Sequence, residues 1–145
     1  MDTSWYRKFF CREAKFDLKA ARDKANQGDA DAQFTLGLNY GSARGDLQAL
    51  AQAAQWCRKA AEQNHSLAQF NLGMRYHRAS VWGRQLDALE TKIEAYKWLQ
   101  LAAVQGYMGS AEACEHMTLG MTREEVAAGN RAAAAFVVRN PAEAE

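Results

Sequence analysis

Apolar positions recur along most of this chain at intervals of three and four residues, the spacing of one face of an α-helix. Within residues 47–64 this spacing gives two adjacent apolar stripes, Ala49-Ala53-Trp56-Ala60 and Leu50-Ala54-Cys57-Ala61. Applied along the chain, the pattern predicts seven helices, over residues 4–26, 30–41, 47–63, 66–79, 87–105, 108–118 and 122–138. Thr122 and Glu125 have the spacing of a capping box, so we expect the last helix to begin there.

One segment of this pattern occurs twice. "AQFTLGLNY", Ala32–Tyr40, and "AQFNLGMRY", Ala68–Tyr76, begin 36 residues apart (68 minus 32) and agree at six of nine positions. Each copy places a glycine, Gly37 or Gly73, inside a predicted helix, where glycine costs about 1 kcal/mol relative to alanine. We therefore predict that another helix backbone approaches these glycines too closely for a side chain, and that packing between repeat units offsets the cost.

The ends of the predicted helices repeat as well. Gln27-Gly28, Gln63-Asn64 and Gln105-Gly106 each close a helical stretch. Glycine or asparagine directly after a helix favours a left-handed residue that ends it. Each unit is thus expected to be a helix, a turn of three residues and a second helix.

Composition agrees with a helical domain. The chain has 145 residues, of which 48% are apolar and 24% charged, and it contains a single proline. Scarce β-branched residues and abundant alanine favour helices over a sheet. A formal net charge of +1, with acidic and basic residues interleaved, excludes binding of nucleic acid by phosphate neutralisation.

The same sequence bears on location and redox state. No apolar run reaches the roughly 18 residues of a membrane span, and no signal peptide is visible. We expect a cytoplasmic protein, or a periplasmic or secreted one if a signal peptide has been trimmed. Cys11, Cys57 and Cys114 are odd in number and widely spaced, which predicts reduced, buried thiols and no disulfide framework.

The repeat resembles the Sel-one-like repeat (SLR) family, close kin of the tetratricopeptide repeats. The family pattern A-Q-x-x-L-G-x-x-Y matches at Ala32–Tyr40 and Ala68–Tyr76, and A-x-x-W-x-x-x-A-A-x-Q-G matches at Ala53–Asn64, apart from its last residue, and at Ala95–Gly106. "MTREEVAAGNRAAAAF" resembles the closing helix of bacterial members, and Cys114-Glu115 replaces Leu-Gly in a degenerate third unit.

This resemblance, which covers roughly residues 20–138, implies an all-α right-handed α/α solenoid of about three antiparallel helix pairs. Residues 1–145 would form a single domain. It would comprise an N-terminal capping helix at 4–26, repeat cores at 27–63, 64–105 and 106–121, and a C-terminal capping helix at 122–138.

The resemblance also implies function. Members of the family are adaptors and scaffolds that bind proteins or peptides, so we expect no catalysis and no cofactor. Bacterial members take part in secretion, signalling, envelope assembly and toxin neutralisation. An immunity-type protein or an accessory of secretion or signalling is therefore an alternative to a general adaptor.

In the kindred tetratricopeptide repeats the first helix of each pair lines a concave groove. Carried over to this chain, that surface comprises Phe34, Leu38, Asn39, Phe70, Met74, Arg75, His77 and Arg78, continued by Glu112 and His116 in the third unit. Such a surface would suit an amphipathic helix or an extended peptide. Phe34 and Phe70 could instead belong to the core, since aromatic residues at helical spacing are often packed inside.

Three further features offer alternatives. Cys114-Glu115-His116 could be part of a metal or catalytic site, but no ligand pair has zinc-type spacing, and we expect no metal. "SWYRKFFCR", Ser4–Arg12, could cap the solenoid, dock a partner, mediate weak self-association or lie on an anionic membrane. The second unit is six residues longer than the first between its tyrosine and tryptophan (22 minus 16). Trp82 in this inserted loop could anchor a partner or fold back onto the next unit.

Overall fold

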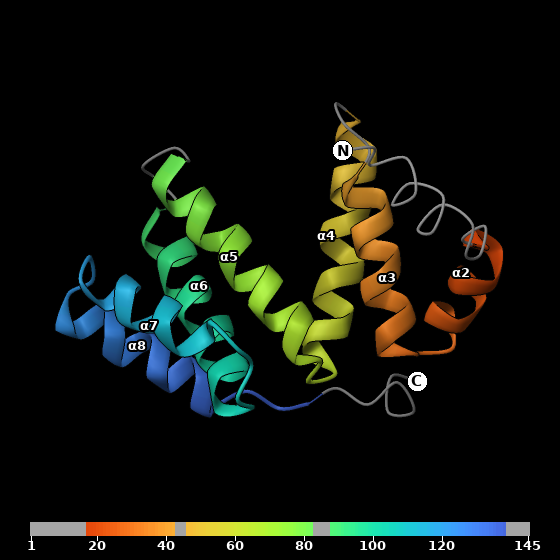
Figure 1. Cartoon of the computed structure of the whole chain (residues 1–145). Helices are drawn as coiled ribbons and strands as arrows, with labels where there is room; N and C mark the ends of the chain where they lie inside the picture. Colours follow the sequence, from red (N-terminus) through yellow and green to blue (C-terminus); the bar gives the residue numbers. More distant parts are fainter. Residues whose placement is uncertain (1–16, 43–45, 83–87, 139–145) are drawn as a thin grey trace, which may run out of the picture.

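The computed structural model describes residues 17–42, 46–82 and 88–138, and within these ranges it contains seven helices and no strand. The helices are α2 (Leu18–Asn26), α3 (Ala30–Gly41), α4 (Leu47–Glu62), α5 (Ser66–Trp82), α6 (Ala88–Val104), α7 (Ser110–Thr118) and α8 (Arg123–Ala134). The molecule is an all-α solenoid, as predicted, in which α3 packs on α4 and α5 packs on α6 (Figure 1).

The third unit is arranged differently from the first two. Both α7 and α8 pack against α6, and direct packing between α7 and α8 is minor. A ring of Tyr96 on α6 lies against Gly129 of α8, where an added Cβ would meet Tyr96 Cδ1 at 2.5 Å. The last two helices thus close the solenoid by covering α6 rather than by forming an independent pair.

The helix starts follow the polar residues that precede them. The side chains of Asp17, Asp29 and Asp46 accept backbone N–H groups at the starts of α2, α3 and α4. The capping box expected at Thr122 is present, with both reciprocal bonds to Glu125. At the start of α5 the ring of His65 takes this role, since its Nδ1 accepts the N–H of Ala68 over 3.1 Å.

The predicted left-handed residues end their helices. Gly28, Asn64 and Gly106 have φ values of 96°, 66° and 74°. The N–H of the residue after each one bonds back across the turn, as in Asp29 to the carbonyl of Lys24 and His65 to that of Ala60. This is the bond pattern of a Schellman motif, which satisfies carbonyls at the helix end.

Several predicted boundaries are wrong. Helix α5 continues to Trp82 rather than ending at residue 79, so residues 80–82 are helical and not part of a loop. Helix α8 ends at Ala134 rather than at 138, because the chain leaves the helix and brings the ring of Phe136 edge-on to Trp98, with ring centroids 5.6 Å apart. Of the capping helix expected at 4–26, only Leu18–Asn26 lies within the described residues; "SWYRKFFCR" lies outside them.

The glycine prediction is correct about close approach and wrong about where it occurs. A Cβ on Gly37 would overlap Cys57 Sγ, and one on Gly73 would lie 2.7 Å from Leu99 Cγ and 3.1 Å from the Leu99 backbone nitrogen. Cys57 and Leu99 belong to the second helices of the same units. These glycines therefore allow the two helices within each pair to pack closely. They do not mediate the packing between units that we expected.

Two buried clusters form the core. One joins the first two pairs through Phe34, Cys57, Ala60, Ala61, Ala68, Leu72 and Trp98. The other joins α6 to α7 through Ala95, Tyr96, Leu99, Cys114 and Met117, and the partly buried Val126 of α8 packs against it. Cys57 and Cys114 are buried free thiols, as predicted, and Cys11 lies outside the described residues.

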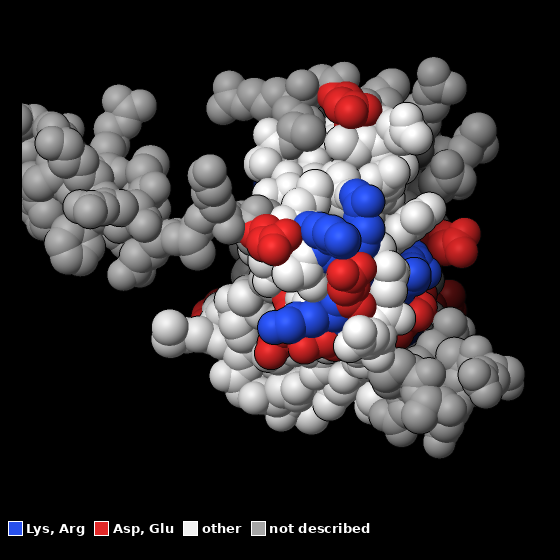
Figure 2. Space-filling view, turned by 90° about the vertical axis from the view of Figure 1, so that its right-hand side faces the viewer, with Lys and Arg blue, Asp and Glu red and all other residues white. Residues whose placement is uncertain are grey.

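Charge is mixed on the surface near α2. On the face that Figure 2 shows, Lys and Arg side chains lie among Asp and Glu side chains, as the interleaved sequence predicts. Among the described residues, no helix combines the length and the hydropathy needed to cross a bilayer.

Candidate functional site

Paired glutamines connect the repeat units. Gln63 Nε2 donates to Gln33 Oε1 over 2.7 Å, and Gln33 Nε2 donates in turn to the carbonyl of Ala25 over 3.0 Å. Gln105, Gln69 and the carbonyl of Ala61 repeat this chain of bonds, with distances of 2.7 and 3.1 Å. We call this arrangement the glutamine relay. It connects the end of the second helix of each unit to the first helix, and the first helix to the helix before it.

Away from the relay, the first two units diverge. After the turn at Gln63–His65, α5 runs away from α4, and α3 and α5 hardly touch (Figure 1). The first two pairs thus stand at an angle and leave open space between them. Gly37 and Gly41 of α3 border this space, and a Cβ on either would point toward α4.

A groove of about 570 Å³ occupies this space. It is lined by Gly37, Leu38 and Gly41 of α3 and by Ser42 directly after it, by Leu50 and Cys57 of α4, and by Phe70, Asn71, Met74, Arg75 and Arg78 of α5. Leu38 is 50% exposed and Met74 37% exposed. We call it the interunit groove. It brings together Leu38, Phe70, Met74, Arg75 and Arg78 from the surface expected from the sequence.

The other three residues of that expected surface lie elsewhere. Phe34 is only 6% exposed and stacks on His65, with ring centroids 5.1 Å apart, so the core interpretation applies to it. Asn39 is exposed on α3 but does not line the groove. His77 lies edge-on to His116 of α7, with ring centroids 6.5 Å apart, outside the groove.

Phe70 occupies the position equivalent to Phe34 yet lines the groove. It is half-buried and packs against Tyr107, with ring centroids 5.0 Å apart. The core interpretation thus applies to Phe34, and the groove interpretation applies to Phe70.

The floor of the groove carries a thiol. Burial raises the pKa of Cys57 above its ordinary value, and the positive charge of the nearby Arg75 acts in the opposite direction. The net effect keeps Cys57 a protonated thiol at neutral pH, so no thiolate neutralises the charge of Arg75.

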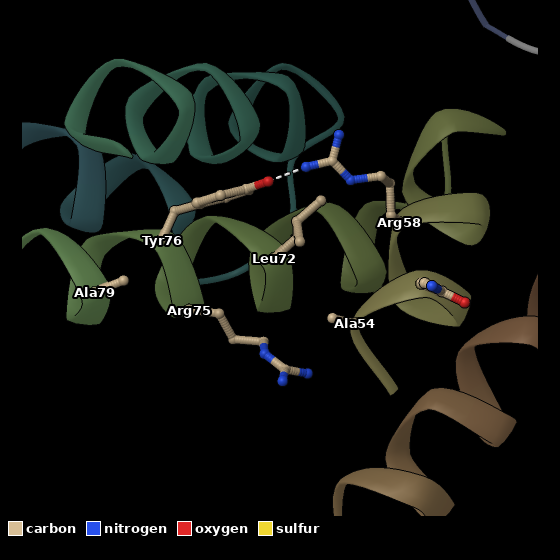
Figure 3. Close-up of a pocket in the computed structure, with 7 residues that line it drawn as sticks. Ala54, Arg58, Leu72, Arg75, Tyr76 and Ala79 are labelled. Atoms are coloured by element: carbon tan, nitrogen blue, oxygen red, sulfur yellow. Dashed lines mark hydrogen bonds between the residues drawn. The ribbon is translucent and has the colours of Figure 1, made fainter. Parts of the chain in front are cut away.

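A smaller cleft of about 290 Å³ lies between α4 and α5 on the other side of Arg75. In it, Arg58 donates to the hydroxyl of Tyr76, as Arg22 does to Tyr40 in the preceding unit (Figure 3). The Arg75 side chain extends from α5 away from the Arg58–Tyr76 pair. Sequence reasoning missed this repeated arginine–tyrosine bond, although the 36-residue spacing of both partners could have shown it.

Trp82 is not at the tip of a loop. It is the last residue of α5 and is 84% exposed, next to Val81 at 59%. It therefore does not fold back onto a neighbouring unit. The rest of the predicted insertion falls partly on α6 and partly outside the described residues.

The residues weighed as a metal or catalytic site do not converge. Cys114 is buried against α6, and burial raises its pKa from 9.0 to about 11. His116, two residues further along α7, is exposed and faces His77. Within the described residues, no group of three or more His, Cys, Asp or Glu side chains could hold a metal ion.

Comparisons with known proteins bear on the fold. No protein-family model matches the sequence, and no curated protein matches it either. A solved structure does match: a protective antigen present in uropathogenic Escherichia coli strains, which displays an SLR fold. The match has a TM-score of 0.68 and 26% sequence identity, and it covers 82% of this chain but only 24% of that one. This chain thus corresponds to about a quarter of the antigen's length. The repeated sequence pattern, the paired helices and this structural match relate the chain to the Sel-one-like repeat proteins.

Proposed function

We propose that this protein is a non-catalytic binding module that holds a segment of a partner protein in the interunit groove. The observation that carries the proposal is the gap between α3 and α5, where partly exposed apolar side chains line a groove formed by three helices. Apolar surface of this kind, edged by polar groups, is typical of peptide-binding sites.

The arrangement of reactive side chains supports a role without catalysis. Nucleophilic cysteine chemistry needs a thiolate and a nearby base. The pKa of Cys114, about 11, leaves it protonated at neutral pH, and its neighbour His116 faces another helix. Helical repeat folds of this type generally serve as binding scaffolds.

Finer assignments belong to the same proposal. The family resemblance is compatible with an immunity-type protein, or with an accessory of secretion or signalling, acting in the cytoplasm. Each would use a binding surface of this kind, and the identity of the partner separates them.

The experiment is affinity capture from the source cells with the full chain as bait. The test bait carries Met74→Asp and Arg78→Glu, which place charge repulsion in the groove. The control bait carries Met108→Asp and Arg123→Glu, two exposed positions outside the groove. We expect a protein captured by the natural chain to be lost with the test bait and kept with the control, while circular dichroism shows equal helicity.

Two outcomes contradict the proposal. If both double variants retain the same captured protein, the groove is not the binding surface. If the test variant loses helicity, Met74 and Arg78 stabilise the fold; a milder pair, Met74→Gln and Arg78→Gln, then repeats the capture, and retained binding by that pair rejects the groove.

A further inference from the structure

The wall that α5 contributes to the interunit groove changes character along its length. Phe70, Met74 and Arg78 follow one another at intervals of four residues, so they lie on one face of the helix. The face is apolar at Phe70 and Met74 and basic at Arg78, with Arg75 beside it. On the opposite wall, Leu38 continues the apolar surface and Ser42 the polar one.

In the part of the chain that the structure describes, the two arginines of the groove have no carboxylate partner. Elsewhere in the described residues, Lys92 lies 3.5 Å from Glu125 and Lys97 lies 3.3 Å from Glu94. Neither Arg75 nor Arg78 forms an ion pair with a described residue, and no Asp or Glu is among the residues that line the groove. Two positive charges without a carboxylate partner among the described residues thus face one partly enclosed apolar surface, an arrangement that favours an anionic ligand.

The shape of the groove indicates what kind of segment fits. All three walls are faces of helices, and α3 and α5, which would otherwise contact each other, are held apart. An additional helix laid between them could pack its side chains against both, as neighbouring helices do. A carboxylate on that helix could accept two parallel hydrogen bonds from a guanidinium.

We propose that the interunit groove binds an amphipathic helix of a partner protein whose apolar stripe is flanked by Asp or Glu residues. This inference rests on the proposed binding function and specifies its ligand class. Leu38, Phe70 and Met74 contact the stripe, and Arg75 and Arg78 pair with the flanking carboxylates.

The test uses the full chain and three fluorescein-labelled synthetic helical peptides of about 18 residues, or roughly five turns. The peptides share one leucine–alanine stripe and differ only in the flanking residues, which are Glu, Gln or Lys. Fluorescence anisotropy at low salt measures each affinity. We expect the Glu peptide to bind at least about tenfold more tightly than the Gln peptide and the Lys peptide to bind weakest, with the preference shrinking as salt is raised.

Exchanging the charge of both groove arginines tests more directly whether they determine the peptide preference. The double variant Arg75→Glu and Arg78→Glu should reverse the order and favour the Lys peptide. Matched control variants, Arg58→Glu in the neighbouring cleft and Arg123→Glu on α8, should keep the preference for the Glu peptide. Thermal unfolding of each variant establishes that it is folded, and the Arg75→Gln and Arg78→Gln pair, which should equalise the Glu and Gln peptides, replaces the exchange if that variant unfolds.

Several outcomes overturn the inference. Equal binding of the three peptides does so, as does a Glu preference that survives exchange of both arginines. Arginine-dependent flotation with phosphatidylglycerol vesicles, without peptide preference, would assign the charge to a membrane. A dimer that the exchange converts to a monomer would make a second copy the occupant.

The capture experiment can distinguish failure of this inference from failure of the proposed function, with one bait that carries Met74→Asp alone and another that carries the exchange of both arginines. If Met74→Asp alone abolishes capture of a partner but exchange of the arginines does not, the groove binds its partner without using its charge. In that case the inference fails and the proposed function stands. If neither change affects capture, both fail.

Discussion

The side chain of Gln105 at the end of α6 donates a hydrogen bond of 2.7 Å to Oε1 of Gln69, which is fully buried on α5. Gln69 passes the interaction on to the carbonyl of Ala61. Replacing Gln69 removes these two bonds and its bond to Asn64 Oδ1, although Gln105 and the Ala61 carbonyl each keep a bond to Asn64.

We expect Gln69→Leu, which keeps the volume but not the hydrogen bonds, to lower the free energy of unfolding by about 2–3 kcal/mol. Gln105→Leu should cost less, about 1 kcal/mol, because Gln105 is exposed and water can replace its role. Urea denaturation followed by circular dichroism measures both. Equal costs for the two variants would show that the relay does not depend on burial.

Gly37 and Gly41 offer a matched pair of glycines on one helix. Gly37→Ala would place a methyl group against Cys57 Sγ, so we expect a net loss of about 1–2 kcal/mol despite the better helix propensity of alanine. At Gly41 the new Cβ would meet Ala53 Cβ at 3.7 Å, an ordinary contact. Gly41→Ala should therefore be neutral or stabilising by up to about 1 kcal/mol.

A second substitution identifies the cause of the Gly37 effect. If the sulfur is the obstacle, Cys57→Ala should reduce the cost of Gly37→Ala, and a double-mutant cycle would show a coupling of about 1 kcal/mol. Additive effects would instead assign the cost to the backbone atoms of Ala53 and Cys57, each 3.2 Å from the added Cβ.

His65 caps α5 in the position where aspartate begins α2, α3 and α4. Since Nδ1 accepts the N–H of Ala68, Nε2 carries the proton and donates to Asp31 over 2.9 Å. We expect His65→Ala to cost about 1–2 kcal/mol, because it removes both the cap and the stacking on Phe34. Asp31→Ala should cost under about 0.5 kcal/mol, since the Asp31 side chain is 90% exposed.

Thermal unfolding of these two variants measures both costs, and a further substitution at His65 tests the cap alone. His65→Asp supplies a carboxylate of the kind found at Asp29 and Asp46, and should recover about half of the stability lost with alanine. No recovery would mean that the ring stacking, and not the cap, is what His65 contributes.

Alkaline pH should destabilise the protein through its buried thiols. The pKa of Cys114 rises from 9.0 to about 11 on folding, so the native state holds its proton where the unfolded state has lost it. Stability from this group is present below pH 9 and is lost as the pH rises through 11. Cys57, whose pKa burial also raises, acts in the same direction.

The measurement is the free energy of unfolding between pH 8 and about 11, under reducing conditions. Cys114→Ala should flatten the decline while lowering stability at pH 8. Cys57→Ala should flatten it less, since the charge of Arg75 opposes the shift there. An unchanged slope in Cys114→Ala would show that other groups govern the alkaline transition.

The sequence predicted the helices well where local signals agree. The 30–41 helix has its predicted bounds because Asp29 and the repeated apolar pattern both specify it. The end of α8 was missed because Ala135 and the apolar residues after it continue the helical pattern beyond Ala134, whereas contact between Phe136 and Trp98 draws the chain away. Helix propensity is a local property, and this contact is between residues distant in sequence.

The site could be predicted only in part for a related reason. Periodicity placed Phe34 and Phe70 on one face of their helices, and their positions in the repeat are equivalent. Each ring packs on the residue that follows the turn at the next helix end, His65 for Phe34 and Tyr107 for Phe70, yet their burial differs. That difference depends on how the neighbouring helices pack, which no residue spacing reports. That Arg75 and Arg78 lack carboxylate partners among the described residues likewise depends on distances between helices, which are set only once the chain has folded.

The glutamine relay gives the solenoid a direction. Every bond in it runs from a later helix to an earlier one, and the final acceptor is always a carbonyl at the end of the preceding helix. Shortening the protein from its C-terminal side therefore leaves the earlier acceptors in place, whereas removal of α2 takes away the group on which Gln33 depends. The acceptor of every bond in the relay therefore precedes its donor in the sequence, and has already been made on the ribosome when the donor is added.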